Sequence, residues 1–278
     1  MSTLKERVSS FQQSRSPRAF FLWLLVPCVL CVAFPASAEA SAASKRSKVV
    51  SYMRSMATIQ WTPENEISYW KPWNGFNFKV GTVYTGVPYT QYGRETNLKQ
   101  FKGFLKKEGK QKPKYTGPTN SGGYRGSDCS SAVSMAWQQA DPEFPICWTG
   151  ILFPEHNARV VKVGDYAITA NNSTAKIVQD NGAEKIKAAY AKLKPGDAVF
   201  NHAPSGAGHV RLVVKVNLKK QEVITIEQTG KNPNGSEGTN STWRVDKAYS
   251  FDELLGTNYL PISLKAFGTS APKKKKQK

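Results

Sequence analysis

The sequence has few of the residues from which metal centres are built. It contains three histidines and four cysteines in 278 residues. After residue 38 it has neither a Cys-x-x-Cys nor a His-Glu-x-x-His spacing, the patterns that hold zinc in many proteins. We therefore expect no metal site.

Acidic residues are also scarce. Twenty Asp and Glu face 39 Lys and Arg, which gives a formal net charge of +19. Such an excess attracts anionic partners, which include nucleic acid, acidic lipid and acidic cell-wall polymer. Hydrophobic content of 40% and aromatic content of 11% are enough for a packed core and exclude a wholly disordered chain.

Long apolar runs are missing except for one at the N-terminus. This run, Ala19 to Phe34, follows four cations and precedes the small residues up to Ala38. The arrangement is typical of a secretory signal peptide, and the run is short of the about 20 residues that span a membrane. We predict a signal peptide over 1–38, cleaved near Ala38, with an uncleaved anchor as the alternative.

Export narrows the choice of partner. Removal of residues 1–38 takes away four cations and one anion, and leaves +16 of the +19. We expect the mature protein to be secreted, or to lie in the periplasm or cell envelope. Nucleic acid is then not expected as a partner. A phosphate- or carboxylate-rich envelope polymer is then the natural contact of its basic surface.

The exported chain divides into three parts by composition. Residues 39–78 form a lead-in that is helical over 44–57 and then rich in aromatic residues. Residues 79–265 form the main domain. Residues 266–278 form a basic tail that ends in a run of lysines.

Hydrophobic periodicity predicts the elements of the main domain. A short strand followed by a turn around Gly86 to Pro88 is expected in 79–91, and a surface loop is expected over 106–119. Helices are expected at 98–105, from Cys129 to about 140, at 183–193 and at 251–255, and strands at 198–201, 209–216, 222–228 and 242–245. Helices followed by antiparallel strands indicate the α+β class, with the Cys129 helix packed on the sheet.

Cys129 is the first candidate for a reactive group. It opens a helix that Ser127 or Asp128 caps, and the positive end of a helix dipole favours a thiolate. Cys28 and Cys31 lie in the signal peptide, so Cys147 is the other cysteine of the mature chain. A Cys129–Cys147 disulfide is therefore the alternative.

A thiolate nucleophile needs a base and a group that orients the base. His209 opens the strand at 209–216 after a glycine-containing loop, where it is both fixed and reachable. The next strand ends in Glu227 and Gln228, and either accepts a hydrogen bond from an imidazole. Strand alternation places Ile226 in the core, which makes Glu227 the more accessible partner.

These residues resemble the motifs of the NlpC-type cell-wall cysteine peptidases. Asp-Cys-Ser at 128–130 resembles the family's nucleophile motif, and the segments that begin at Pro195 (Pro-Gly-Asp-Ala-Val-Phe) and Gly208 (Gly-His-Val-Arg-Leu-Val-Val) resemble its base segment. The segment from Gly86 (Gly-Val-Pro-Tyr-Thr-Gln) resembles its upstream Pro-Tyr motif. The resemblance covers residues 79–262.

The resemblance implies a papain-like fold in which Cys129 is the nucleophile, His209 the base and a residue of the next strand the orienting group. The family often has His at that third place, whereas Glu227-Gln228 is closer to the Glu of the related CHAP amidases. Tyr89 would be a substrate-side residue, and we place Asp128, Ser130 and Gln228 in the same substrate-binding set. No cofactor is needed.

The expected function is hydrolysis of amide bonds in peptidoglycan stem peptides by a monomeric, exported enzyme. The backbone N–H of Cys129 would help to stabilise the oxyanion. Two alternatives stay open. One is a non-catalytic papain-like binder of anionic envelope polymer, and the other is the same site acting on other amides as a toxin or an acyltransferase.

Overall fold

The computed structural model describes residues 36–68, 77–119, 123–230 and 240–268. These residues belong to one compact unit that begins at Ala36. The described part of the chain contains no helix long and apolar enough to cross a membrane. The predicted apolar run at 19–34 lies outside the described residues, and the signal peptide stays a prediction.

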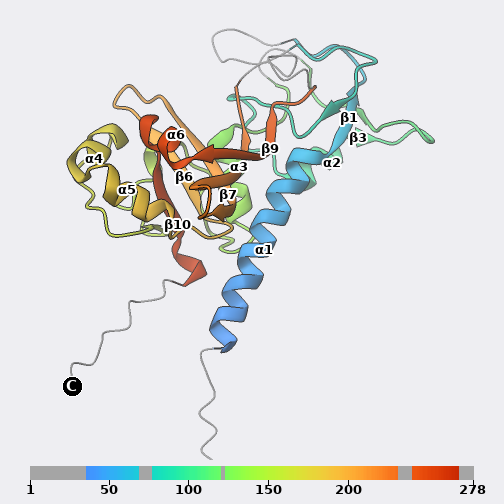
Figure 1. Cartoon of the computed structure of the whole chain (residues 1–278). Coiled ribbons are helices and arrows are strands. Elements are labelled where there is room, and N and C mark those ends of the chain that lie inside the picture. Colours follow the sequence, from blue (N-terminus) through green and yellow to red (C-terminus); the bar gives the residue numbers. More distant parts are fainter. Residues whose placement is uncertain (1–35, 69–76, 120–122, 231–239, 269–278) are drawn as a thin grey trace, which may run out of the picture. The chain divides into compact units, whose positions relative to one another are not determined.

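The main sheet has six antiparallel strands, which confirms the α+β class (Figure 1). Its order is β5 (Val160–Lys162), β10 (Leu260–Leu264), β6 (Ala198–His202), β7 (Gly208–Asn217), β8 (Glu222–Gln228) and β9 (Trp243–Ser250). The predicted strands at 198–201, 209–216, 222–228 and 242–245 correspond to β6 through β9. Strand β9 continues five residues beyond the predicted end, to Ser250.

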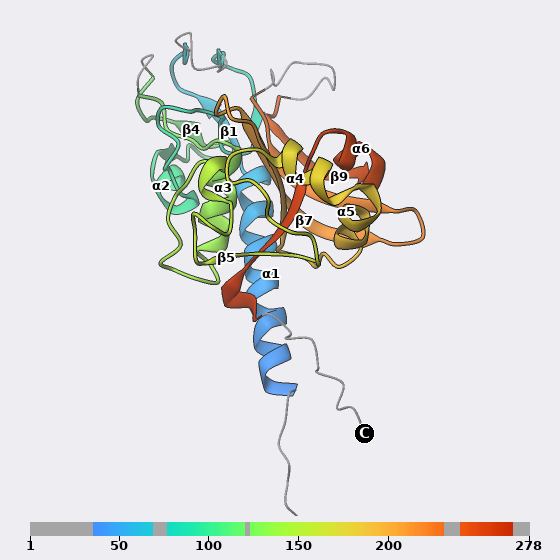
Figure 2. The ribbon, with the colours of Figure 1, turned by 90° about the vertical axis from the view of Figure 1, so that its left-hand side faces the viewer.

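Helices cover both faces of this sheet. Helices α1 (Ala36–Thr58) and α3 (Cys129–Trp137) pack on β7 and β8, and on each other (Figure 2). Helices α4 (Thr174–Asn181) and α5 (Ala183–Tyr190) pack against β6 and β10, and α6 (Phe251–Gly256) follows β9. Successive residues of β6 point to opposite faces, and Ala198, Val199 and Phe200 are all fully buried.

A smaller mixed sheet packs around Trp61 of the lead-in, whereas Tyr69, Trp70, Trp73 and Phe76 lie outside the described residues. The order of its strands is β2 (Tyr84–Thr85), β1 (Gln60–Pro63), β4 (Lys114–Tyr115) and β3 (Leu105–Lys106). Helix α2 (Leu98–Gly103) lies between β2 and β3 in the chain. Trp61 is fully buried, and its ring centroid lies 5.3–5.8 Å from those of Phe78, Tyr84, Phe101 and Tyr115.

Two expectations need correction in this region. The strand predicted from residue 79 is only the two residues of β2, and the chain bends after it at Gly86 and Val87, where the turn was predicted. The predicted surface loop at 106–119 contains β4, and Tyr115 in it is 1% exposed. Glycine and proline there form the turn of a short hairpin rather than an uninterrupted loop.

Helix α1, in the segment named the lead-in, packs into the hydrophobic core. Val49, Met53, Met56 and Ala57 repeat at helical spacing and are 0–1% exposed. Arg46 adds an ion pair of 2.7 Å to the buried Asp197 on the sheet. The helix begins at Ala36, before the predicted cleavage point at Ala38.

Truncation of Met53 should therefore destabilise the whole domain. We expect Met53→Ala to lower the free energy of unfolding by ~2–5 kcal/mol, because a buried side chain is replaced by a cavity. The measurement is urea unfolding followed by tryptophan fluorescence. Ser51→Ala, on the exposed side of α1, is the control. Equal stability of the two variants would contradict the packing of α1.

Candidate functional site

Cys129 is the first residue of helix α3. Asp128 is the N-cap, and its Oδ1 accepts a hydrogen bond from the backbone N–H of Ser131 at 2.7 Å. The serine hydroxyl in turn accepts from the N–H of Asp128 at 2.9 Å, which completes a reciprocal cap. Cys129 is 9% exposed, so its thiol is held close to the helix N-terminus with a small opening to solvent.

The segment before α3 is fixed by a close approach to the chain around Tyr89. The N–H of Ser127 donates to the Pro88 carbonyl at 3.1 Å, and the N–H of Thr90 donates to the Ser127 carbonyl at 2.9 Å. A Cβ on Gly126 would lie 2.1 Å from the Pro88 oxygen, so glycine is required there. This pairing brings the predicted substrate-side Tyr89 next to the thiol helix.

His209 lies on β7, and Glu227 lies on the neighbouring strand β8 of the same sheet. Its Nε2 is 2.5 Å from Glu227 Oε2. The imidazole also interacts electrostatically with Cys129, and both residues line one cavity. The three residues predicted as nucleophile, base and orienting group are therefore linked in that order.

Glu227 is buried inside a network of further partners. It is 1% exposed, accepts from Arg211 Nε at 2.9 Å, and also accepts from the Tyr249 hydroxyl. The Arg211 guanidinium carbon lies 3.7 Å from the Tyr249 ring centroid and 4.2 Å from that of Tyr259. The cation is thus stacked on aromatic rings while it neutralises the carboxylate.

The pKa values of His209 and Glu227 are shifted in opposite directions. Burial alone would lower the pKa of His209, but the Cys129 thiolate and the Glu227 carboxylate together raise it to about 9. Burial works against the charge of Glu227, yet hydrogen bonding to His209 and the charges of His209 and Arg211 lower its pKa to about 2. At pH 7 the imidazole is therefore protonated and the carboxylate ionised.

A cavity of about 410 Å³ gives access to this site. Cys129 and His209 line it together with Tyr89, Trp148 and Thr149. Trp148 is 48% exposed, and its ring packs edge-on against His202 with centroids 5.1 Å apart. An extended substrate in this cavity would meet the thiol, the imidazole and an aromatic wall.

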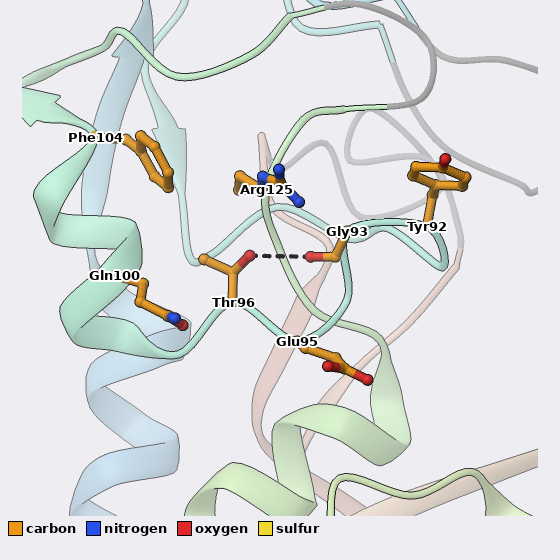
Figure 3. A pocket seen from close by; sticks show the side chains of 7 residues that line it. All are labelled: Tyr92, Gly93, Glu95, Thr96, Gln100, Phe104 and Arg125. Atoms are coloured by element: carbon orange, nitrogen blue, oxygen red, sulfur yellow. Dashed lines mark hydrogen bonds between the residues drawn. The ribbon is translucent and has the colours of Figure 1, made fainter.

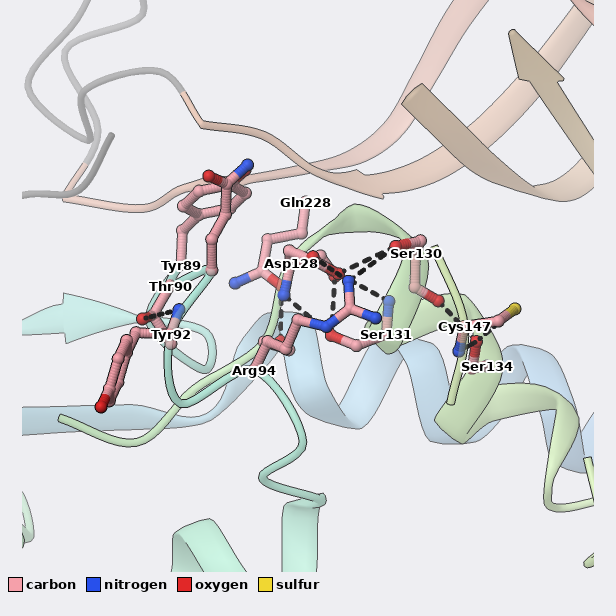
Figure 4. A network of polar contacts seen from close by, with 12 residues as sticks. Tyr89, Thr90, Tyr92, Arg94, Asp128, Ser130, Ser131, Ser134, Cys147 and Gln228 are labelled. Atoms are coloured by element: carbon pink, nitrogen blue, oxygen red, sulfur yellow. Dashed lines mark hydrogen bonds and ion pairs between the residues drawn. The ribbon is translucent and has the colours of Figure 1, made fainter. Parts of the chain in front are cut away.

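Asp128 and Ser130 line the same cavity, although their polar atoms already have protein partners (Figure 4). Asp128 Oδ2 accepts from Arg94 Nη1 at 2.7 Å, and Ser130 Oγ donates to Asp128 Oδ1 at 3.1 Å. The Arg94 cation offsets the carboxylate beside the helix N-terminus. Substrate binding by these two residues stays a prediction.

Gln228 lies apart from the imidazole. It is fully buried, accepts from Ser127 Oγ at 2.5 Å and donates to the Val87 carbonyl at 2.9 Å. Of the two alternatives for the partner of His209, Glu227 makes the contact. The expected difference in exposure is wrong, because Arg211 and Tyr249 cover the Glu227 carboxylate.

The other candidate residues have structural partners. Cys129 and Cys147 are both free thiols, and Cys147 Sγ lies 3.4 Å from Ser134 Oγ inside the protein. Burial raises the pKa of Cys147 to about 11. His156 Nδ1 is 2.8 Å from the Gly150 carbonyl, and His202 Nδ1 is 2.9 Å from Thr149 Oγ1.

Sequence reasoning missed the residues around Glu227. Arg211 stands two positions after His209 on a predicted strand, so strand alternation places both on one face. That signal was sufficient to include Arg211. Tyr249 lies beyond the end of the strand predicted at 242–245, and Tyr259 directly precedes β10. No local sequence pattern marks either residue as a neighbour of Arg211.

Elsewhere, a cavity of about 440 Å³ lies between helix α2 and the turn that holds Thr96 (Figure 3). Thr96 Oγ1 donates to the Gly93 carbonyl at its wall, and Arg125 and Glu95 also line it. The described residues of its wall include neither a cysteine nor a histidine. Within the described residues, no group of His, Cys, Asp or Glu is placed to hold a metal ion.

Comparison with known proteins adds no assignment. No family model matches the chain, and neither a curated protein nor a solved structure matches it.

The linked pair predicts a distinctive titration of His209. We expect its imidazole to lose a proton near pH 9 rather than near 6.5, because the Cys129 thiolate and Glu227 favour the charged form. Nuclear magnetic resonance of the histidine ring measures this directly. In Cys129→Ala the pKa should fall, since one negative charge is removed. An ordinary value in the wild type would contradict the geometry.

Proposed function

We propose that the protein is a cysteine hydrolase of amide bonds, with Cys129 as nucleophile, His209 as acid and base, and Glu227 as the orienting group. The observation that carries the proposal is the chain of contacts from thiol to imidazole to buried carboxylate at the wall of an open cavity. A nucleophile, a base and a third group in this order form the general arrangement for covalent catalysis.

The geometry supports a two-stage reaction. The Cys129 thiolate attacks the carbonyl carbon, and the backbone N–H of Cys129 at the start of α3 helps to stabilise the developing oxyanion, since the N–H of Ser131 already donates to Asp128. The His209 imidazolium then gives its proton to the amine as the carbon–nitrogen bond breaks. In the second stage, neutral His209 takes a proton from water, which attacks the thioester and releases the acid.

Glu227 and its neighbours keep His209 in the productive orientation. Because Nε2 of the ring faces Glu227, the other ring nitrogen is left for the thiol. Arg211 and Tyr249 fix the carboxylate from two further sides. They act through Glu227, and so are positioning residues rather than groups that touch the substrate.

We propose that the protein has a papain-like fold and that its substrates are peptidoglycan stem peptides. This part of the proposal rests on the resemblance of the segments at 86–91, 126–131, 195–200 and 208–214 to the NlpC-type peptidases. The lysine- and arginine-rich sequence supports attachment to an anionic envelope polymer. A toxin or an acyltransferase with the same site would share the chemistry and differ in the amide it accepts.

Digestion of peptidoglycan tests the proposal. We expect Cys129→Ala to lower the rate of release of soluble peptides at least ~10³-fold, because no other group replaces the nucleophile. Cys147→Ala is the matched control, since it removes the buried thiol that takes no part in the reaction. If Cys129→Ala releases the same products at the wild-type rate, the catalytic assignment fails.

Thiol labelling separates the enzyme from a non-catalytic binder. In native protein at pH 7 we expect iodoacetamide to modify Cys129 rapidly and Cys147 slowly, because a thiol with a pKa of about 11 is ionised to only about one part in ten thousand. Peptide mass spectrometry gives the site and rate. Two unreactive native thiols, or a disulfide between them, would favour the binder.

A further inference from the structure

A second cavity, of about 450 Å³, adjoins the candidate site. It shares His209 and Gly230 with the cavity that holds Cys129, so the two meet at the imidazole. Among the described residues, Arg211, Arg244 and Lys247 line it, against the single carboxylate of Glu227. A cavity beside a candidate active site therefore carries an excess of positive charge.

An irregularity in β9 places these cations together. Residues three apart on a regular strand point to opposite faces. In the pairing of β8 with β9, however, Thr225 faces Lys247, Ile226 faces Val245 and Glu227 faces Arg244. Asp246 is therefore an extra residue, a bulge that brings Arg244 and Lys247 to the face of Glu227.

The bulge also removes the acidic side chain from the cavity. Asp246 has a left-handed backbone with φ of 56° and forms an ion pair of 2.7 Å with Arg54 of α1. Of the remaining acidic groups, Glu227 is already bound by His209, Arg211 and Tyr249.

One further carboxylate lies in range of Lys247. The charge of Lys247 helps to lower the pKa of Glu253, after the larger effect of hydrogen bonds to Ser250. Glu253 accepts from the backbone N–H of Ser250 at 2.6 Å, as part of the cap of α6. It reduces the positive field without closing the cavity, because Glu253 does not line it.

We propose that this cavity, defined by Arg244 and Lys247, binds a carboxylate on the leaving-amine side of the peptide that the site cleaves. The inference rests on the proposed function, because the leaving amine must pass His209 to receive its proton. Another cavity at His209 is lined by Thr174, His202 and Thr257, and its wall has neither lysine nor arginine among the residues that the structure describes. The carboxylate is therefore directed to the side of Arg244 and Lys247.

The test uses two stem tetrapeptides, one with a C-terminal carboxylate and one with a carboxamide. Their binding to the Cys129→Ala protein is measured by calorimetry, so the result does not depend on turnover. We expect the carboxylate peptide to bind about two- to fivefold more tightly, as one partly exposed ion pair provides. Lys247→Gln in the same background should remove most of the preference, and Lys247→Arg should retain it.

Lys219→Gln is the control, because Lys219 lies in the β7–β8 turn and outside the cavity. Inorganic phosphate should weaken the binding of the carboxylate peptide more than that of the carboxamide peptide. Equal affinity of the two peptides, absence of binding, or a preference that persists in Lys247→Gln would overturn the proposal. Selective binding without cleavage by the wild type would contradict the proposed hydrolase and leave the carboxylate site standing.

Discussion

The buried carboxylate of Glu227 is the constraint on which the rest of the site depends. An ionised group that is 1% exposed is stable only when hydrogen bonds and opposite charge replace water. Here His209, Arg211 and Tyr249 supply them from two neighbouring strands. Removal of one partner from a buried ion pair lowers the free energy of unfolding by about 3–5 kcal/mol, so these contacts stabilise the sheet. The same contacts orient the imidazole.

The thiol reaches this carboxylate system through the packing of two layers. Helix α3 lies on β7 and β8, so its first residue meets the start of β7 at His209. Asp128 caps the helix and is neutralised by Arg94, which leaves the N-terminus favourable to a negative sulfur. Charge is thus balanced at both ends of the Cys129–His209 pair.

Much of this arrangement was predictable from the sequence because it depends on local patterns. Alternation gave strands β6 to β8, and the capped helix at Cys129 followed from Asp128 and the apolar spacing after it. The class of fold and the link from His209 to Glu227 followed from adjacent strands. The papain-like assignment and the reaction stay proposals, because they rest on resemblance and chemistry rather than on a matching fold.

What escaped prediction depends on contacts between distant segments. The burial of Glu227 requires Arg211 and Tyr249 to cover it, and the cationic cavity requires the extra residue Asp246 in β9. A bulge has no reliable local signature when the residue is not glycine. Likewise, Tyr115 becomes core only because Trp61 and Phe101 pack against it across the smaller sheet.

The central proposal is that Cys129 acts as a thiolate nucleophile paired with the His209 imidazolium. Ultraviolet absorbance of the thiolate, taken as the difference between wild type and Cys129→Ala, measures it most directly. Cys147 contributes nothing near pH 7, since burial raises its pKa to about 11. The account predicts thiolate absorbance at pH 7 that disappears in His209→Ala. Its absence from the wild type at pH 7, or its persistence in His209→Ala, would contradict the account.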